Sequence, residues 1–281
     1  MEASTAAAIQ IALIVLSAAS FWPQYCRILT LQQSVGISPY YVLLNLISAT
    51  EQLALGLYLA MSHEVDDDGM VRFPLPWGRW LNLAHFAVVC ICQLVLIIMC
   101  LLFPSHHPWT NRTVVVAIYV GFALVSLGPV ILELLPPPQS DPLGGRRWFS
   151  AFVAVLHVYL LGPVVTLLAF VALFPQIREI RTRPGPSVLS PLGLAIQALL
   201  FAVVALSWLV RMVLPIPLES IPWDRLLHVL VVWYQLVGWA AVDNFAYAFV
   251  QTVLWVVEKA HRMLLLHGDE TAPLIDASAA G

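Results

Sequence analysis

The chain has 281 residues, of which 60% are hydrophobic and 10% charged, and its formal net charge is -3. Soluble domains carry about a quarter charged residues, so this composition excludes an ordinary soluble globule. The sequence contains no basic block, which argues against nucleic acid as a partner.

Apolar runs recur along the whole chain, and seven of them are long enough to span a bilayer. A spanning helix needs about 20 apolar residues, because in lipid it must satisfy its own backbone polar groups. In chain order the runs cover residues 6–29, 40–61, 80–103, 114–135, 149–174, 189–213 and 226–257. We therefore predict an all-α membrane protein with seven transmembrane helices.

A short internal repeat links the first predicted helix to the fifth. Residues 23–39 read PQYCRILTLQQSVGISP, and residues 175–191 read PQIREIRTRPGPSVLSP. Six of these seventeen aligned positions are identical, whereas chance would give about one. The two copies lie 152 positions apart, as the numbers of Pro23 and Pro175 give directly.

The repeat predicts how the seven helices are organised. Four crossings separate helices 1 and 5, so the two copies cross the bilayer in the same direction, as in parallel-repeat transporters. We predict a 3+1+3 plan of two three-helix bundles joined by a linker helix. The predicted units are residues 1–111 for the first bundle, 112–148 for the linker helix and its loop, 149–258 for the second bundle and 259–281 for a cytosolic tail.

The orientation in the membrane follows from arginines after the fifth run. Arg178, Arg181 and Arg183 fall in what the apolar pattern predicts to be a short loop. Short loops rich in Lys and Arg favour the cytosolic side. With seven spans, this orientation also places the C-terminus in the cytosol.

Three motifs in the first copy carry a family resemblance. Pro23-Gln24 is followed by Gly36-Ile37-Ser38 and then by Asn45-Leu46. This set resembles the PQ-loop repeat family, in particular the cystinosin-like lysosomal and vacuolar transporters and, more distantly, the SWEET sugar transporters and the KDEL receptors. The second copy departs from the pattern, because Val188 stands where the glycine would be and Gln197 stands where cystinosin-like proteins carry an aspartate.

The Pro-Gln pairs are candidate hinges. A proline inside a helix cannot donate to the carbonyl four residues back, so Pro23 and Pro175 should weaken the helix one turn earlier, near Ala19 and Val171. Gln24 and Gln176 follow directly, and their amides could bond to the freed carbonyls. The resemblance implies a hinge role in alternating access, and a static kink is the alternative.

Two acidic residues interrupt the apolar runs: Glu51 in the second and Asp243 in the last. Ionisable groups in mid-membrane cost about 2.5–3.5 kcal/mol on insertion scales, so they usually face a cavity or a partner. Proton coupling is our hypothesis for Asp243, with Glu51 as a second candidate. A structural hydrogen bond to a neighbouring helix is the alternative for Asp243.

The polar residues near these acids form a candidate solute site. The last run places Trp239, Asp243 and Tyr247 on one helical stripe with Asn244 beside it, and Asn45 corresponds to Gln197 at the repeat offset. We predict that the substrate-binding residues are Asn45, Gln197, Trp239, Asn244 and Tyr247. The alternative for Asn45 and Gln197 is polar contact between helices.

The C-terminal residues resemble an acidic dileucine sorting signal. Glu270 is followed after three residues by Leu274 and Ile275. Such an address is read by a sorting adaptor in the cytosol, and it favours a vacuolar or lysosomal membrane.

The sequence thus favours a transporter that moves a small polar solute, such as an amino acid, across an organelle membrane. A cargo or sorting receptor similar to the KDEL receptors is the second hypothesis, and an intramembrane scaffold without a ligand is the third. Enzyme activity is not expected, because HExxH and GxSxG do not occur. The expected partners are the solute, protons, the lipid bilayer and a sorting adaptor, with no cofactor or metal.

Overall fold

The computed structural model describes residues 3–61, 78–104, 109–134, 145–183, 185, 187–211 and 226–270. Every regular element in these residues is helical. Seven helices in them are long and apolar enough to cross a membrane, which confirms the predicted all-α fold with seven candidate spans. Each candidate span contains a strongly apolar stretch of 18 residues, which explains why apolar runs in the sequence predicted the spans.

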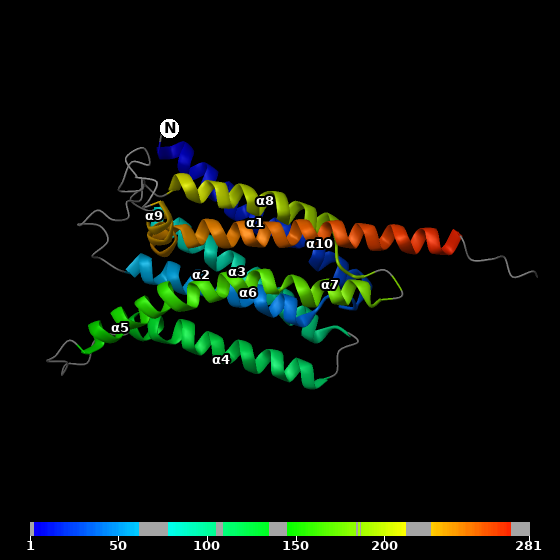
Figure 1. Cartoon of the computed structure of the whole chain (residues 1–281), viewed down its shortest axis with the longest axis horizontal. Helices are drawn as coiled ribbons and strands as arrows, with labels where there is room; N and C mark the ends of the chain where they lie inside the picture. The colour runs from blue at the N-terminus through cyan, green and yellow to red at the C-terminus, as the bar shows by residue number, and fades with distance from the viewer. Residues whose placement is uncertain are drawn as a thin grey trace, which may run out of the picture.

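Figure 1 shows the helices as one elongated bundle. The first four are α1 (Ala3–Leu31), α2 (Pro39–Met61), α3 (Gly78–Leu102) and α4 (Trp109–Leu134). The fifth crossing is segmented into α5 (Gly145–Leu156), the π-helical turn η2 (His157–Leu161), α6 (Gly162–Val171) and α7 (Leu173–Arg181). They are followed by α8 (Pro191–Arg211), α9 (Leu226–Trp233), the π-helical turn η5 (Tyr234–Gly238) and α10 (Trp239–Glu270).

Other helices surround α2, whereas α4 lies at the outside of the bundle. α2 contacts α3, α4 and α6, while α10 packs along α8 and α1 lies between α3 and α8. In the strongly apolar 18-residue stretch of each helix, 72% is buried inside the protein for α2 but only 17% for α4. In Figure 1, α4 accordingly runs along one edge, and the end of α10 extends past the other helices on the side where α7 ends. α2 therefore supplies the central wall against which interior sites are built.

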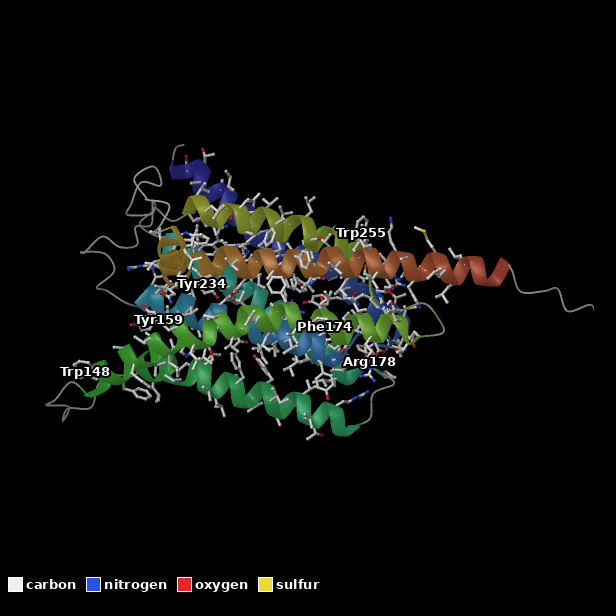
Figure 2. The ribbon with its side chains drawn as sticks, viewed as in Figure 1. Trp148, Tyr159, Phe174, Arg178, Tyr234 and Trp255 are labelled. Carbon is white, nitrogen blue, oxygen red and sulfur yellow. The ribbon has the colours of Figure 1, made fainter. Side chains whose placement is uncertain are left out.

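The side chains are arranged as a bilayer requires. Large apolar residues are exposed, with Leu167 at 65% and Leu199 at 72%, while many polar side chains are buried. Figure 2 shows Trp148 at one end of the bundle, with Phe174 and Trp255 toward the other. Because lipid accepts apolar surface and gives no hydrogen bonds, the polar groups gather between the helices.

Prolines and glycines explain the segmentation of the fifth crossing. Pro163 has no N–H for the carbonyl of Tyr159, and the preceding amide of Gly162 instead bonds to His157 in a wider π turn. Farther along, α6 ends at Val171 and α7 begins at Leu173, so the helix is interrupted at Ala172, and the Val171 carbonyl lies one turn before Pro175. By contrast, α1 runs past Pro23 without interruption.

Two predicted boundaries are wrong. Arg178 and Arg181 lie in the last turn of α7 and not in a loop. The final helix continues to Glu270, well past the predicted end at residue 257. In both places the helix extends into polar sequence, which a criterion based on apolar runs cannot detect.

Candidate functional site

A small cavity lies between the helices, and several polar side chains are among the residues that line it. Its walls come from five elements: α2, α3, α6, α8 and α10. The lining residues are Asn45, Ser48, Ala49, Gln52, Val89, Gln93, Ala169, Phe201, Asp243, Asn244 and Tyr247. Three of the five predicted substrate-binding residues and the predicted proton-coupling aspartate therefore border one cavity.

Asn45 places an unpartnered acceptor at this cavity. Its side chain is 3% exposed, and its Nδ2 donates to the Tyr41 carbonyl over 2.9 Å. Its Oδ1 has no hydrogen-bond partner among the residues that the structure describes. A buried acceptor without a partner costs about 1–3 kcal/mol, so this atom favours a ligand that donates a hydrogen bond.

Asp243 lies on the cavity wall near the start of α10, with 5% of its surface exposed. Gln52 Nε2 donates to Asp243 Oδ2 over 3.4 Å, and the Thr166 hydroxyl donates to Oδ1. Thr166 Oγ1 also lies 2.7 Å from the Tyr234 hydroxyl. Tyr234 can donate to Thr166, which leaves the Thr166 hydrogen for the carboxylate. Asp243 is thus held by one group from α2 and one from α6.

Tyr247 connects the cavity to its α8 wall. Gln93 Nε2 donates to the Tyr247 hydroxyl, which donates in turn to Gln197 Oε1, each over 3.1 Å. Gln197 is therefore one hydrogen bond away from the cavity and does not line it. Asn244 lines the cavity and donates to the Ala240 carbonyl over 2.6 Å.

Trp239 and Glu51 lie outside the lining of this cavity. Trp239 packs against Phe86 with ring centroids 5.4 Å apart, and both border a second hollow near Trp208. Glu51 points to His157 instead. Trp239 and Asp243 lie four residues apart on one face of α10, as predicted. This separation of about one helical turn places Trp239 beyond the end of the cavity.

The Pro-Gln glutamines exchange hydrogen bonds between the two repeats. Gln24 accepts from the Ser190 amide over 2.8 Å and donates to the Val188 carbonyl over 3.3 Å. Gln176 accepts from the Ser38 amide over 2.9 Å and donates to the Gly36 carbonyl over 2.8 Å. In this structure the two amides do not bond to the carbonyls freed by the prolines of their own helices, because each one holds the loop of the other copy.

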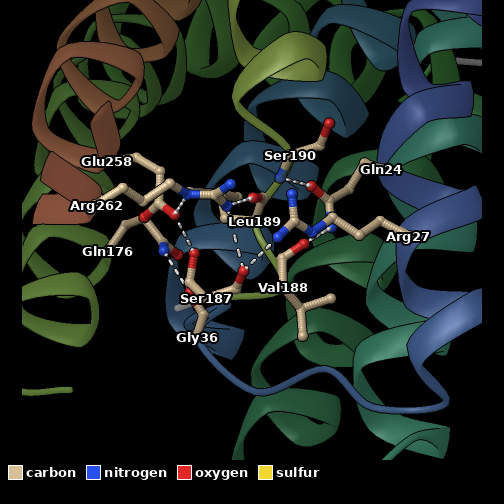
Figure 3. Close-up of polar contacts among 10 residues, drawn as sticks. All are labelled: Gln24, Arg27, Gly36, Gln176, Ser187, Val188, Leu189, Ser190, Glu258 and Arg262. Carbon is tan, nitrogen blue, oxygen red and sulfur yellow. Dashed lines mark hydrogen bonds and ion pairs between the residues drawn. The ribbon is translucent and has the colours of Figure 1, made fainter. Parts of the chain in front are cut away.

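These paired contacts follow the repeat offset. The loop residues Gly36 and Ser38 correspond to Val188 and Ser190 at 152 positions, the same separation as Gln24 and Gln176. Each glutamine is buried, at 6% and 0% exposure. Figure 3 shows both glutamines with the loop between them. The two copies thus share a reciprocal contact between a helix side chain and a loop backbone.

The loop of the second copy, which contains residues 187–190, also bonds to charged side chains from α1 and α10 (Figure 3). Arg27 Nη2 donates to the Ser187 carbonyl over 3.0 Å, and the Ser187 hydroxyl donates to Glu258 Oε1 over 2.6 Å. Arg262 donates to the same Glu258 oxygen over 2.7 Å and to the Leu189 carbonyl over 2.9 Å. This end of the bundle is tied together by hydrogen bonds from α1, α7 and α10.

Gly36 allows the two loops to meet. It has a φ of +92°, and a Cβ at this position would lie 2.3 Å from Arg183 Nη1 and 2.5 Å from the Ser187 Cβ. The adjacent backbones also bond directly, through the Val188 amide and the Val35 carbonyl at 3.0 Å. Burial lowers the pKa of the Arg183 guanidinium, and the nearby carboxylates of Glu179 and Glu258 oppose that shift.

The family of the first repeat is shown by comparison with known families. Residues 5–54 match the family model described as PQ loop repeat, over α1 and most of α2. The protein is a PQ-loop multi-pass membrane protein. A comparison with curated proteins gives no match. The matched PQ-loop segment contains Pro23, Gln24 and the cavity residue Asn45.

The predicted sorting signal of this PQ-loop protein falls at the edge of what the structure describes. Glu270 is the last residue of α10, and Leu274 and Ile275 lie outside the described residues. The signal stays a prediction.

Sequence reasoning missed the partners of Glu51. Glu51 Oε1 lies 2.7 Å from His157 Nδ1, and the Ser126 hydroxyl donates to Oε2 over 2.8 Å. All three side chains are buried, at 3% exposure or less. The available signal was a histidine within an apolar run, five residues before Gly162, which with Pro163 is expected to distort the helix.

Proposed function

We propose that this PQ-loop protein is a transporter that moves a small polar solute of amino-acid size across an organelle membrane. The cavity beside Asn45 and Asp243 carries this proposal, because it is lined by residues from five helical elements and combines an acceptor, a carboxylate and amides. A vacuolar or lysosomal membrane agrees with the tail signal predicted above.

The polar groups of the cavity favour a solute with at least one hydrogen-bond donor. Asn45 Oδ1 lacks a partner in the described part of the chain, and Asp243 on α10 supplies a carboxylate to the same cavity. A protonated amine satisfies both groups, since an ammonium carries three donors and a positive charge. An amino acid is therefore the solute class that we would test first.

Proton coupling is assigned to Asp243 in this proposal, with Glu51 as the second acidic group. A carboxylate that carries no proton is costly in a membrane interior, so loading a proton allows the empty site to reorient. Asp243 suits this role because it borders the cavity and is held by Gln52 and Thr166 from different helices. A change in helix packing then alters the surroundings of the carboxyl group.

Alternating access requires that one end of the cavity closes while the other opens. The reciprocal hydrogen bonds of Gln24 and Gln176 close the end of the bundle where the two loops meet. The interruption at Ala172 allows the fifth crossing to bend. We propose that the cycle breaks and remakes these contacts. This role goes beyond a static kink, because the two glutamines join the copies rather than their own helices.

Uptake at the cell surface tests the proposal. The variant with Leu274 and Ile275 replaced by alanine is expected to reach the plasma membrane, where labelled amino acids and sugars are offered at acidic external pH. In this background Asn45→Ala should weaken the apparent affinity about tenfold, as expected for one lost hydrogen bond to the solute. Saturable binding without any uptake would support the cargo receptor and reject transport.

A matched pair of variants on α10 tests the coupling. Asp243→Asn should abolish acid-driven accumulation, because the amide cannot release a proton. Glu258→Gln makes the same chemical change at a buried carboxyl outside the cavity, and its uptake should keep the acid dependence whatever its rate. Full acid-driven accumulation in Asp243→Asn would exclude the coupling role of Asp243.

A further inference from the structure

Glu51, His157 and Ser126 form a buried cluster away from the cavity. They come from three elements, α2, η2 and α4, and their exposed fractions are 1%, 3% and 0%. Glu51 takes a contact on each oxygen, from His157 Nδ1 at 2.7 Å and from the Ser126 hydroxyl at 2.8 Å. Within the described residues, none of these hydrogen bonds involves a lysine or an arginine. The charge balance of the cluster therefore depends on protons.

We propose that Glu51 and His157 form a proton-binding pair, separate from Asp243, that reports its occupancy to the linker helix α4 through Ser126. One proton makes the pair neutral overall, and we place it on Glu51, as a carboxylic acid beside a neutral imidazole. Loss of that proton to water leaves a carboxylate and a neutral imidazole, with a net charge of -1. In a buried site the neutral form is favoured, so release requires that the site becomes hydrated.

The local backbone supports this role. His157 is the first residue of a π-helical turn, and such turns often occur at functional sites because they redirect side chains. The turn precedes Pro163, while Thr166 lies farther along on α6 and contacts Asp243. On α2 the neighbours Glu51 and Gln52 likewise contact His157 and Asp243, respectively. Two adjacent acidic centres are thus spanned by the same two helices.

In the described part of the chain, the titratable side chains near the pair are two tyrosines, a cysteine and Asp243. On α4, Tyr119 lies 3.4 Å from the Thr50 hydroxyl, and on α3, Cys90 lies 3.6 Å from it. On η5, Tyr234 reaches Thr166, which also holds Asp243 on α10. A test for a proton on Glu51 must therefore distinguish it from a proton on Asp243.

The hydrogen bond from Ser126 to Glu51 connects the protonation of the pair to α4. α4 lies at the edge of the bundle and is mostly exposed to lipid, yet its Ser126 is fully buried against Glu51. A carboxylate accepts strongly from this hydroxyl, whereas a carboxylic acid accepts less strongly. The proton on the pair therefore changes how firmly α4 is held. As regulation of solute movement this inference rests on the proposed function, while the proton site itself does not.

Infrared difference spectroscopy of the full chain in lipid bilayers tests the site without any solute. Spectra at acidic and alkaline pH should contain a protonated-carboxyl band that moves with a ¹³C label on glutamate and stays in place with a label on aspartate. The band should be lost in Glu51→Gln and persist in Asp243→Asn. Ser126→Ala removes one hydrogen bond and should shift its frequency, and His157→Gln should change the pH range over which it appears.

Several results would overturn the proposal. One is a glutamate band that persists unchanged in Glu51→Gln, and another is a pH difference spectrum without any glutamate band. A band unaltered in both His157→Gln and Ser126→Ala would mean that these residues only pack against Glu51. The isotope label and the mild Ser126→Ala change keep the test decisive if Glu51→Gln fails to fold. Because no solute is used, failed uptake would reject the transporter and leave this result standing.

Discussion

The two Pro-Gln motifs make matching hydrogen bonds, but the chain around them differs. Gln24 and Gln176 each accept from one loop amide and donate to one loop carbonyl of the other copy. The helix that carries Gln24 is continuous, whereas the helix that carries Gln176 is interrupted at Ala172. The two copies therefore share the contact between them, although the helices that carry the two glutamines differ in continuity.

The two loops differ in the same sense. Gly36 adopts a φ of +92°, while Val188 at the equivalent position lies outside the positive-φ region. The second loop instead receives Arg27, Glu258 and Arg262 as additional partners. One loop thus depends on a backbone conformation and the other on side-chain contacts, which variants can separate.

The largest effect is expected for Gly36→Ala. The new Cβ would disfavour the positive φ and approach Arg183 and Ser187, so we expect the protein to lose about 2–4 kcal/mol of stability. Gly185→Ala is the control, because a Cβ there meets nothing within 4 Å, and its effect should stay within about 0.5 kcal/mol. Denaturant unfolding in detergent micelles measures both, and equal losses would show that the close approach of the loops is unimportant.

An intermediate effect is expected for Gln24→Ala and Gln176→Ala. Each change leaves a buried amide and a buried carbonyl without their side-chain partner, which costs about 1–3 kcal/mol. If the exchange is reciprocal, the two losses should be similar. The double variant gives the coupling between them, since independent contacts add. A loss confined to Gln176→Ala would mean that the second copy alone holds this end together.

Local patterns in the sequence predicted the seven spans and the equivalence of the two copies. Apolar length and identity at a fixed offset are visible without a fold, and they also located Asn45, Asp243 and Tyr247 on faces that meet at one cavity. Helix periodicity assigns a side chain to a face, so residues on one stripe could be proposed together. It does not say where along the axis the cavity ends, which is why Trp239 was misplaced.

The partners of buried polar groups could not be predicted, because they are distant in the chain. Gln24 meets Val188 across 164 positions, and Glu51 meets His157 across 106. Both contacts depend on how loops and a π turn rotate whole segments, and no local pattern in the sequence encodes these rotations. The predicted solvent-side loop at Arg178 was wrong for a related reason, since α7 continues beyond the apolar run.

The smallest change in stability is expected for the prolines themselves, below about 1 kcal/mol, but the two copies should respond differently. Pro175→Ala returns an N–H that can bond to the Val171 carbonyl and close the interruption at Ala172, so amide hydrogen exchange in residues 168–178 should slow about fivefold or more. Pro23→Ala lies in a helix that is already continuous, and exchange in residues 16–26 should change less. Exchange measured by mass spectrometry resolves these segments. Equal slowing in both would show that Pro175 does not cause the interruption, and the hinge would then have to be sought at the π turns instead.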